Sequence, residues 1–287
     1  MKKQFTLTVL AVFAALTMFA QEEATSSDFV SKRGIPILPE AGDYSISVDA
    51  SPFFTYFGNM FNGNAGNTAP TFGFTAAHPF SITGKKMIDA KTAYRGIFRI
   101  GYTHDKFENY VKDDTYISTD TMTVIDTRSV NKMNITIGVG IEKRRGKGRL
   151  QGIYGGQFLF GMNTNKESYK YGNTMNNNNI SPTSTDWNSG NVGQVTTRNL
   201  SNKKAPQFGF NLQGFVGAEY FFAPKFSVSG EVAYGVYFAT QGEGVIEQEE
   251  MPNTGNTSVI GKIITGKESH FGFDTQVSAA INLNFYF

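Results

Sequence analysis

Apolar and polar residues alternate with a period of two along much of the chain. The clearest case is INLNFYF (281–287), in which Ile281, Leu283, Phe285 and Phe287 occupy every second position. Successive side chains of a β-strand point to opposite faces, so this pattern predicts strands with one apolar and one polar face. With the intervening turn signals, the pattern predicts eight strands: 43–58, 71–88, 93–108, 131–144, 149–164, 206–222, 226–240 and 270–287.

The connections between these segments alternate in length. Long ones (59–70, 109–130, 165–205 and 241–269) follow odd-numbered strands, and short turns follow even-numbered ones. Long loops on one side and tight turns on the other are typical of outer-membrane β-barrels. A tilted strand crosses a bilayer in about 9–11 residues, and the predicted strands are longer. The predicted fold is all-β, an eight-stranded antiparallel up-and-down transmembrane β-barrel over 43–287. A soluble secreted β-sandwich is the alternative.

The first twenty residues have the pattern of an export signal. Lys2 and Lys3 precede an apolar stretch that ends at Ala20. This predicts a signal peptide over 1–20, cleaved between Ala20 and Gln21. The next segment, 21–42, is predicted to be periplasmic, and its two prolines argue against helix or sheet interior. We expect it to fold against the base of the barrel or to dock a partner. Both chain ends are expected in the periplasm.

Composition narrows the function. Mean hydropathy is −0.27, which fits a barrel because alternation hides its apolar residues in the average. The sequence has 26 basic and 24 acidic residues, and loss of the two leader lysines would balance them. Nucleic acid is therefore a poor partner. Cysteine is absent, which excludes disulfides, thiolate metal sites and thiol catalysis.

Two stretches carry a family resemblance. KRGIPILPEAGDYSISVDASPFFTYFGNMFN (32–62) and AYRGIFRIGY (93–102) are similar to Bacteroidota-type outer-membrane β-barrel proteins, and the architecture is similar to small OmpA-type barrels. The resemblance covers about the first quarter of the mature chain and the C-terminus. There, Phe287, Phe285, Leu283 and Ile281 resemble the recognition signal read by the barrel-assembly machinery. The resemblance implies the barrel fold and an outer-membrane location, and it supplies no enzymatic activity or catalytic residues to carry over.

The inward faces of the predicted strands carry charges. They are Asp49, Arg95, Arg99, Glu142, Glu219, Glu231 and Asp274. The interior of an eight-stranded barrel is just wide enough for side chains, and a guanidinium can bridge two carboxylates. We therefore expect a luminal charge network, at one depth except for Asp274, that plugs the lumen. A gated narrow pore or a catalytic carboxylate pair are the alternatives.

Other motifs are weaker. His78, His104 and His270 are scattered over three strands, so no metal site or cofactor is predicted, and no catalytic motif indicates an enzyme. The basic turn Lys143–Arg149 is either solvated or in contact with lipid phosphates or an acidic partner. The asparagine-rich loop 165–205, which holds Trp187, is expected to be mobile and without a packed core. Asp120-Thr121-Met122 is similar to a short O-glycosylation sequon.

These features favour a non-enzymatic integral outer-membrane protein with a structural or interaction role, possibly a subunit of a larger envelope complex. A narrow, low-conductance channel is the alternative. The expected partners are outer-membrane lipid and lipopolysaccharide, the barrel-assembly machinery during biogenesis, and other envelope proteins.

Overall fold

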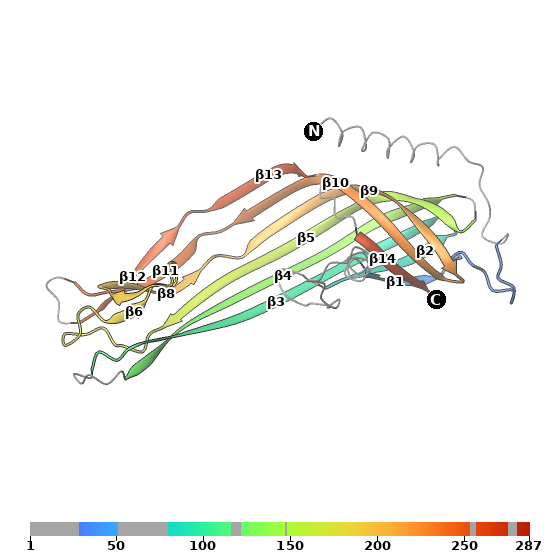
Figure 1. Ribbon diagram of the computed structural model, residues 1–287. Coiled ribbons are helices and arrows are strands. Elements are labelled where there is room, and N and C mark those ends of the chain that lie inside the picture. Colours follow the sequence, from blue (N-terminus) through green and yellow to red (C-terminus); the bar gives the residue numbers. More distant parts are fainter. Residues whose placement is uncertain (1–28, 51–79, 116–121, 147, 253–256, 275–279) are drawn as a thin grey trace, which may run out of the picture.

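The computed structural model describes residues 29–50, 80–115, 122–146, 148–252, 257–274 and 280–287 (Figure 1). Every regular element in these residues is a β-strand. The strands are β1 (Tyr44–Asp49), β2 (Phe80–Asp89), β3 (Thr92–Lys112), β4 (Thr123–Arg145), β5 (Leu150–Lys170), β6 (Thr183–Thr185), β7 (Val192–Gln194), β8 (Thr197–Lys203), β9 (Gln207–Ala223), β10 (Phe226–Gln241), β11 (Gly244–Glu250), β12 (Val259–Thr265), β13 (Glu268–Asp274) and β14 (Ala280–Tyr286). No helix among the described residues is long and apolar enough to cross a membrane.

Antiparallel pairing leads round a closed ring of strands. The order is β1–β2–β3–β4–β5–β9–β10–β14 and back to β1. Val48 of β1, for example, pairs with Ile82 of β2 and with Leu283 of β14. β13 pairs with the upper part of β10. The predicted all-β antiparallel fold is confirmed, and each predicted strand overlaps an observed one. Residues 51–58, 71–79 and 275–279 of the predicted strands, and the predicted loop 59–70, lie outside the described residues.

A second group of strands lies beyond the ring. β4 has 23 residues and β5 has 21, several more than predicted, and the upper part of β5 pairs with β8. β8 pairs with β11, and β11 with β12. We call the described residues of 109–128, 171–203 and 244–265 the cap. Figure 1 shows its strands at the end of the molecule opposite the C-terminus.

The cap corrects the sequence-based view of loop 165–205. This segment contains β6, β7 and β8, and Asn173, Ser184 and Ser201 are buried within it. The prediction that it has no packed core is therefore wrong. The cause is that its polar side chains bond to its own backbone, which apolar patterning does not register.

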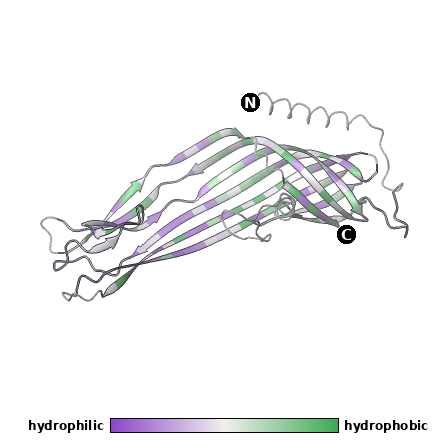
Figure 2. Cartoon of the chain, in the orientation of Figure 1, coloured by the Kyte–Doolittle hydropathy of each residue, from purple (hydrophilic) through white to green (hydrophobic). Residues whose placement is uncertain are grey.

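The outer face of the ring is apolar and exposed. Figure 2 shows the alternation of hydrophobic and hydrophilic residues along the strands. Val139 is 62% exposed and Leu212 64%. They lie at one level, because Val139 pairs with Phe158 and Phe158 pairs with Leu212. Apolar side chains thus form a continuous belt across neighbouring strands, in contrast to the polar inner face.

The base of the ring is closed by the N-terminal segment. Its Ile37 and Leu38 are buried in a cluster with Met87, Ala93, Phe221 and Tyr286, and Phe29 packs against it. The amide of Lys225, in the β9–β10 turn, donates to the carbonyl of Ile37 (3.1 Å). Lys225 also forms an ion pair with Asp43. Residues 29–43 are therefore held to the ring by apolar packing, backbone bonding and charge.

Candidate functional site

Just above the apolar cluster, charged side chains from five strands and a tyrosine from a sixth converge inside the ring. They are Lys85 of β2, Arg95 of β3, Glu142 and Arg144 of β4, Glu219 of β9, Glu231 of β10 and Tyr286 of β14. Glu142 and Arg144 both face inward because they are two residues apart on one strand. We call this set the luminal charge network.

Glu142 is the centre of the network. Its side chain is fully buried, and its carboxylate lies 2.9 Å from Lys85 Nζ, 3.0 Å from an Arg144 nitrogen and 3.4 Å from an Arg95 nitrogen. Three cations from three strands therefore neutralise and fix one carboxylate. Such contacts are strong where water is excluded, but the cations also depend on Glu142 for compensation.

Glu219 and Glu231 complete the pairing. An Arg144 nitrogen lies 2.9 Å from Glu219, whose Oε1 accepts hydrogen bonds from Tyr286 (2.9 Å) and Ser227. Glu231 accepts two hydrogen bonds of 2.9 Å from Arg95, in the bidentate geometry that suits a guanidinium. The network thus holds three cations and three carboxylates, so its formal charges cancel.

Side chains from different strands also contact one another above the network. The Arg95 guanidinium lies 4.2 Å from the centre of the Phe215 ring. Gln157 donates to Gln213 across β5 and β9 (2.8 Å), and both side chains are buried. At this level the inward side chains therefore pack against one another inside the ring.

Four of the seven charged residues predicted for the lumen meet in this network: Arg95, Glu142, Glu219 and Glu231. Arg99 does not. It lies four residues further along β3, about 13 Å by strand geometry, its side chain is exposed, and among the described residues it contacts no carboxylate. Asp49 is half-buried at the level of Asn282, four residues above Tyr286. The side chain of Asp274 lies outside the described part.

Sequence reasoning missed Lys85, Arg144 and Tyr286. Arg144 corrects the view of Lys143–Arg149 as a solvated or lipid-facing turn, because its side chain is buried in the lumen. Its spacing of two from Glu142 was the available signal. Tyr286 alternates with the outward Phe285 and Phe287, which also places it inside.

The remaining predicted residues stay apart. His104 hydrogen-bonds Asn131 (2.7 Å), and His270 lies 3.7 Å from Glu268. Among the residues that the structure describes, no group of three or more His, Cys, Asp or Glu side chains could hold a metal ion. His78, Asp120, Thr121 and the cleavage site Ala20–Gln21 lie outside those residues.

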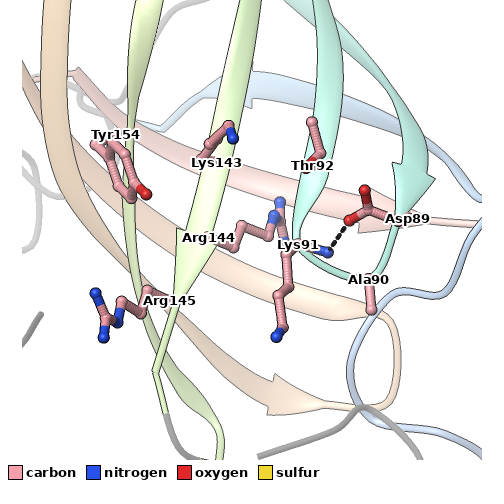
Figure 3. Close-up of a pocket in the computed structure, with 8 residues that line it drawn as sticks. All are labelled: Asp89, Ala90, Lys91, Thr92, Lys143, Arg144, Arg145 and Tyr154. Atoms are coloured by element: carbon pink, nitrogen blue, oxygen red, sulfur yellow. Dashed lines mark hydrogen bonds between the residues drawn. The ribbon is translucent and has the colours of Figure 1, made fainter. Parts of the chain in front are cut away.

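A second site lies at the base, between the β2–β3 and β4–β5 turns. It is a cavity of about 420 Å³ lined by basic side chains, which we call the rim pocket. Figure 3 shows Lys143 and Tyr154 on neighbouring strands, with Lys91 and Arg145 nearer the turns. Asp89 supplies the carboxylate of the lining, and it accepts the backbone N–H of Lys91 (2.7 Å).

The cap contains a third polar cluster. Asp126 is fully buried and accepts the backbone N–H groups of Gly172 (2.9 Å) and Thr185 (2.7 Å). Partial burial alone would raise the pKa of the Asp114 carboxyl, but hydrogen bonds from Thr183 and Asn179 outweigh it and lower the pKa below its usual value. Both carboxylates therefore act as acceptors that hold loop backbone in place.

Comparisons with known proteins add little. No protein-family model matches the sequence, and no curated protein is similar to it. Among solved structures, the outer membrane protein OprG from Pseudomonas aeruginosa is 9% identical, with a TM-score of 0.29, over 88% of this chain and 98% of that chain. At this similarity neither fold details nor activity carry over from OprG to this chain.

Proposed function

We propose that this chain is an integral outer-membrane β-barrel of eight strands, closed at its base, with a structural or interaction role. The observation that carries the proposal is the closed ring with an inverted polarity: apolar side chains such as Val139 and Leu212 are exposed outside, while Glu142 and Arg144 are buried inside. Soluble proteins rarely expose so extended an apolar surface, whereas a lipid bilayer requires one.

The orientation follows from the connections. Short turns join β2 to β3, β4 to β5 and β9 to β10 at the end where β14 and the N-terminal segment meet. In bacterial outer-membrane barrels short turns face the periplasm and long loops face outward. The cap is then the extracellular part, exposed to lipopolysaccharide and to other molecules at the cell surface. The barrel-assembly machinery would insert the chain, and envelope proteins are the proposed partners.

The filled lumen favours this role over the alternative of a narrow channel. The network of Lys85, Arg95, Arg144 and three glutamates neutralises itself and contributes no net charge that would attract ions. Among the described residues, no nucleophile is assembled with an acid or base beside a substrate cavity, and we propose a non-enzymatic role.

Two measurements test the proposal. The protein should fractionate with outer membranes and migrate faster in gels before boiling than after, as a closed barrel does. A soluble protein without this mobility shift would refute membrane insertion. In planar bilayers the inserted protein should give no conductance steps. Discrete steps would refute the sealed lumen and favour the channel.

A further inference from the structure

We propose that the outer wall of the barrel binds one anionic phospholipid of the periplasmic leaflet. Its phosphate would lie in the rim pocket, and one acyl chain would lie in an apolar depression directly above. This inference rests on the proposed function, because the membrane orientation comes from there. Two adjoining features of β3, β4 and β5 carry it.

The first feature is the depression. It has a volume of about 510 Å³ and lies between Tyr94, Val139, Ile141, Phe158 and Leu212, with Gly156 at its floor. Gly156 pairs with Gly214 on β9, and both glycines are exposed on the outer face. At this level, the neighbouring strands β5 and β9 therefore both lack a side chain, in the middle of a belt of large apolar residues. The result is a hollow shaped for a slender apolar group. We call it the glycine notch.

The second feature is the position of the rim pocket. Lys143 pairs with Thr92 and Tyr154, and two residues further along β4, Ile141 pairs with Tyr94 and Gly156. Two residues of strand span about 7 Å. A basic pocket and an apolar hollow therefore follow one another along the same strands, in the order in which a lipid presents phosphate and acyl chain to a membrane protein.

Lys143 and Arg145 are the basic side chains of the rim pocket that are available to a ligand. Among the described residues neither Lys143 nor Arg145 forms an ion pair, and Arg145 Nε is buried without a hydrogen-bond partner. Arg144 contributes to the lining, but its charge is shared with Glu142 and Glu219. A phosphate oxygen is the acceptor that suits a lysine and a guanidinium at a membrane surface.

Lipid retention in native mass spectrometry tests the inference. Detergent-purified protein would be offered dioleoyl phosphatidylglycerol or dioleoyl phosphatidylcholine, which differ only in headgroup. We expect about tenfold more retention of phosphatidylglycerol than of phosphatidylcholine, because one or two basic side chains would attract the anionic headgroup. The double variant Lys143→Gln with Arg145→Gln should lose this preference. Lys132→Gln, at an exposed lysine near the middle of β4, should keep it.

A second variant tests the notch. A Cβ at residue 156 would make only an ordinary contact of 3.7 Å with Gln213 O, so Gly156→Leu fills the hollow without disturbing the strand. We expect retention of both lipids to fall about threefold, from lost contact with a few methylenes. Gly230→Leu is the matched control, because residue 230 faces outward on β10 with open space around it.

Three results would overturn the inference. They are equal retention of the two lipids by the wild-type protein, wild-type retention by Gly156→Leu, and displacement of the lipid by millimolar inorganic phosphate, which would mean a plain anion site. Gel mobility before boiling separates this failure from that of the proposed function. A heat-modifiable barrel without lipid preference would refute the lipid site alone, whereas a protein that never becomes heat-modifiable would refute both.

Discussion

The base of the ring and the cap both bury polar side chains, but their partners differ. In the base, side chains bond to side chains on other strands, as Arg95 does to Glu231. In the cap, side-chain pairs such as Arg198 with Glu249 occur as well, but buried carboxylates also bond to backbone, as Asp126 does to the amides of Gly172 and Thr185. Strands satisfy their backbone in the ladder, so inward side chains are left to one another. Loops leave backbone groups unpaired, so Asp and Asn side chains bind them.

This difference predicts that charge changes in the base affect the whole barrel, whereas charge changes in the cap remain local. The largest effect should come from Glu142→Gln, which leaves Lys85, Arg95 and Arg144 with one carboxylate fewer in a buried site. We expect a loss of about 3–5 kcal/mol in the free energy of unfolding, measured by urea titration of the gel-mobility shift.

The control for this change is Glu108→Gln. Glu108 pairs with Lys106, and both side chains are exposed, so less than about 1 kcal/mol should be lost. Equal effects of the two variants would mean that the luminal charge network does not hold the ring closed.

The next largest effect should come from Asp126→Asn. The carboxylate now accepts hydrogen bonds from two backbone N–H groups. In the variant, the amide NH2 group would face one of them and leave it without an acceptor, which costs about 1–3 kcal/mol locally. Limited proteolysis should then cut within 171–185, while the heat-modified gel shift is unchanged. Glu250→Gln, at an exposed position in the cap, should resist cleavage like the wild type. A lowered unfolding midpoint of the whole barrel would show that this change in the cap is not local, contrary to the comparison with the base.

The cap should also loosen in acid. The folded pKa of Asp114 is lowered, so its contribution to stability is fully present above the unfolded pKa of about 3.9 and is lost as the pH falls through the folded pKa. Hydrogen exchange of 179–185 should accelerate below about pH 4. In Asp114→Asn this exchange should already be fast at neutral pH and change less with acid. An unchanged acid response in that variant would assign the effect to another group.

The smallest effect on stability is expected at the edge of the cap. β12 pairs with β11 along one side, and its Ile260 and Ile264 are 60% and 67% exposed. Because so exposed a side chain contributes little, Ile264→Lys should change the free energy of unfolding by less than about 0.5 kcal/mol. Apolar strand edges promote association, so light scattering of the purified protein should decrease. Unchanged scattering would show that β12 is not an associating edge.

The sequence predicted the ring better than the cap, for a physical reason. Alternation marks a strand where one face is apolar, and this holds from Met133 to Ile141 on β4. Beyond Met133, towards its N-terminus, β4 continues with apolar and polar residues mixed on both faces, which leaves no such signal. The alternation of inward and outward positions along each strand likewise placed Arg95, Glu142, Glu219 and Glu231 inside. The depth of a side chain along the barrel was harder to predict, because Arg99 faces the same side of β3 as Arg95 but lies above the network.

The network also has a consequence for how the chain reaches its final state. Arg95 and Glu231 are 136 residues apart in sequence, and Lys85 and Glu142 are 57 apart. The first pair can form only when strands from both halves of the chain have met, because contacts of long sequence separation come late. A partly assembled ring would carry unpaired charges, which are costly in lipid and tolerable in water. The charges that stabilise the finished barrel therefore oppose the entry of an unfinished one into the bilayer.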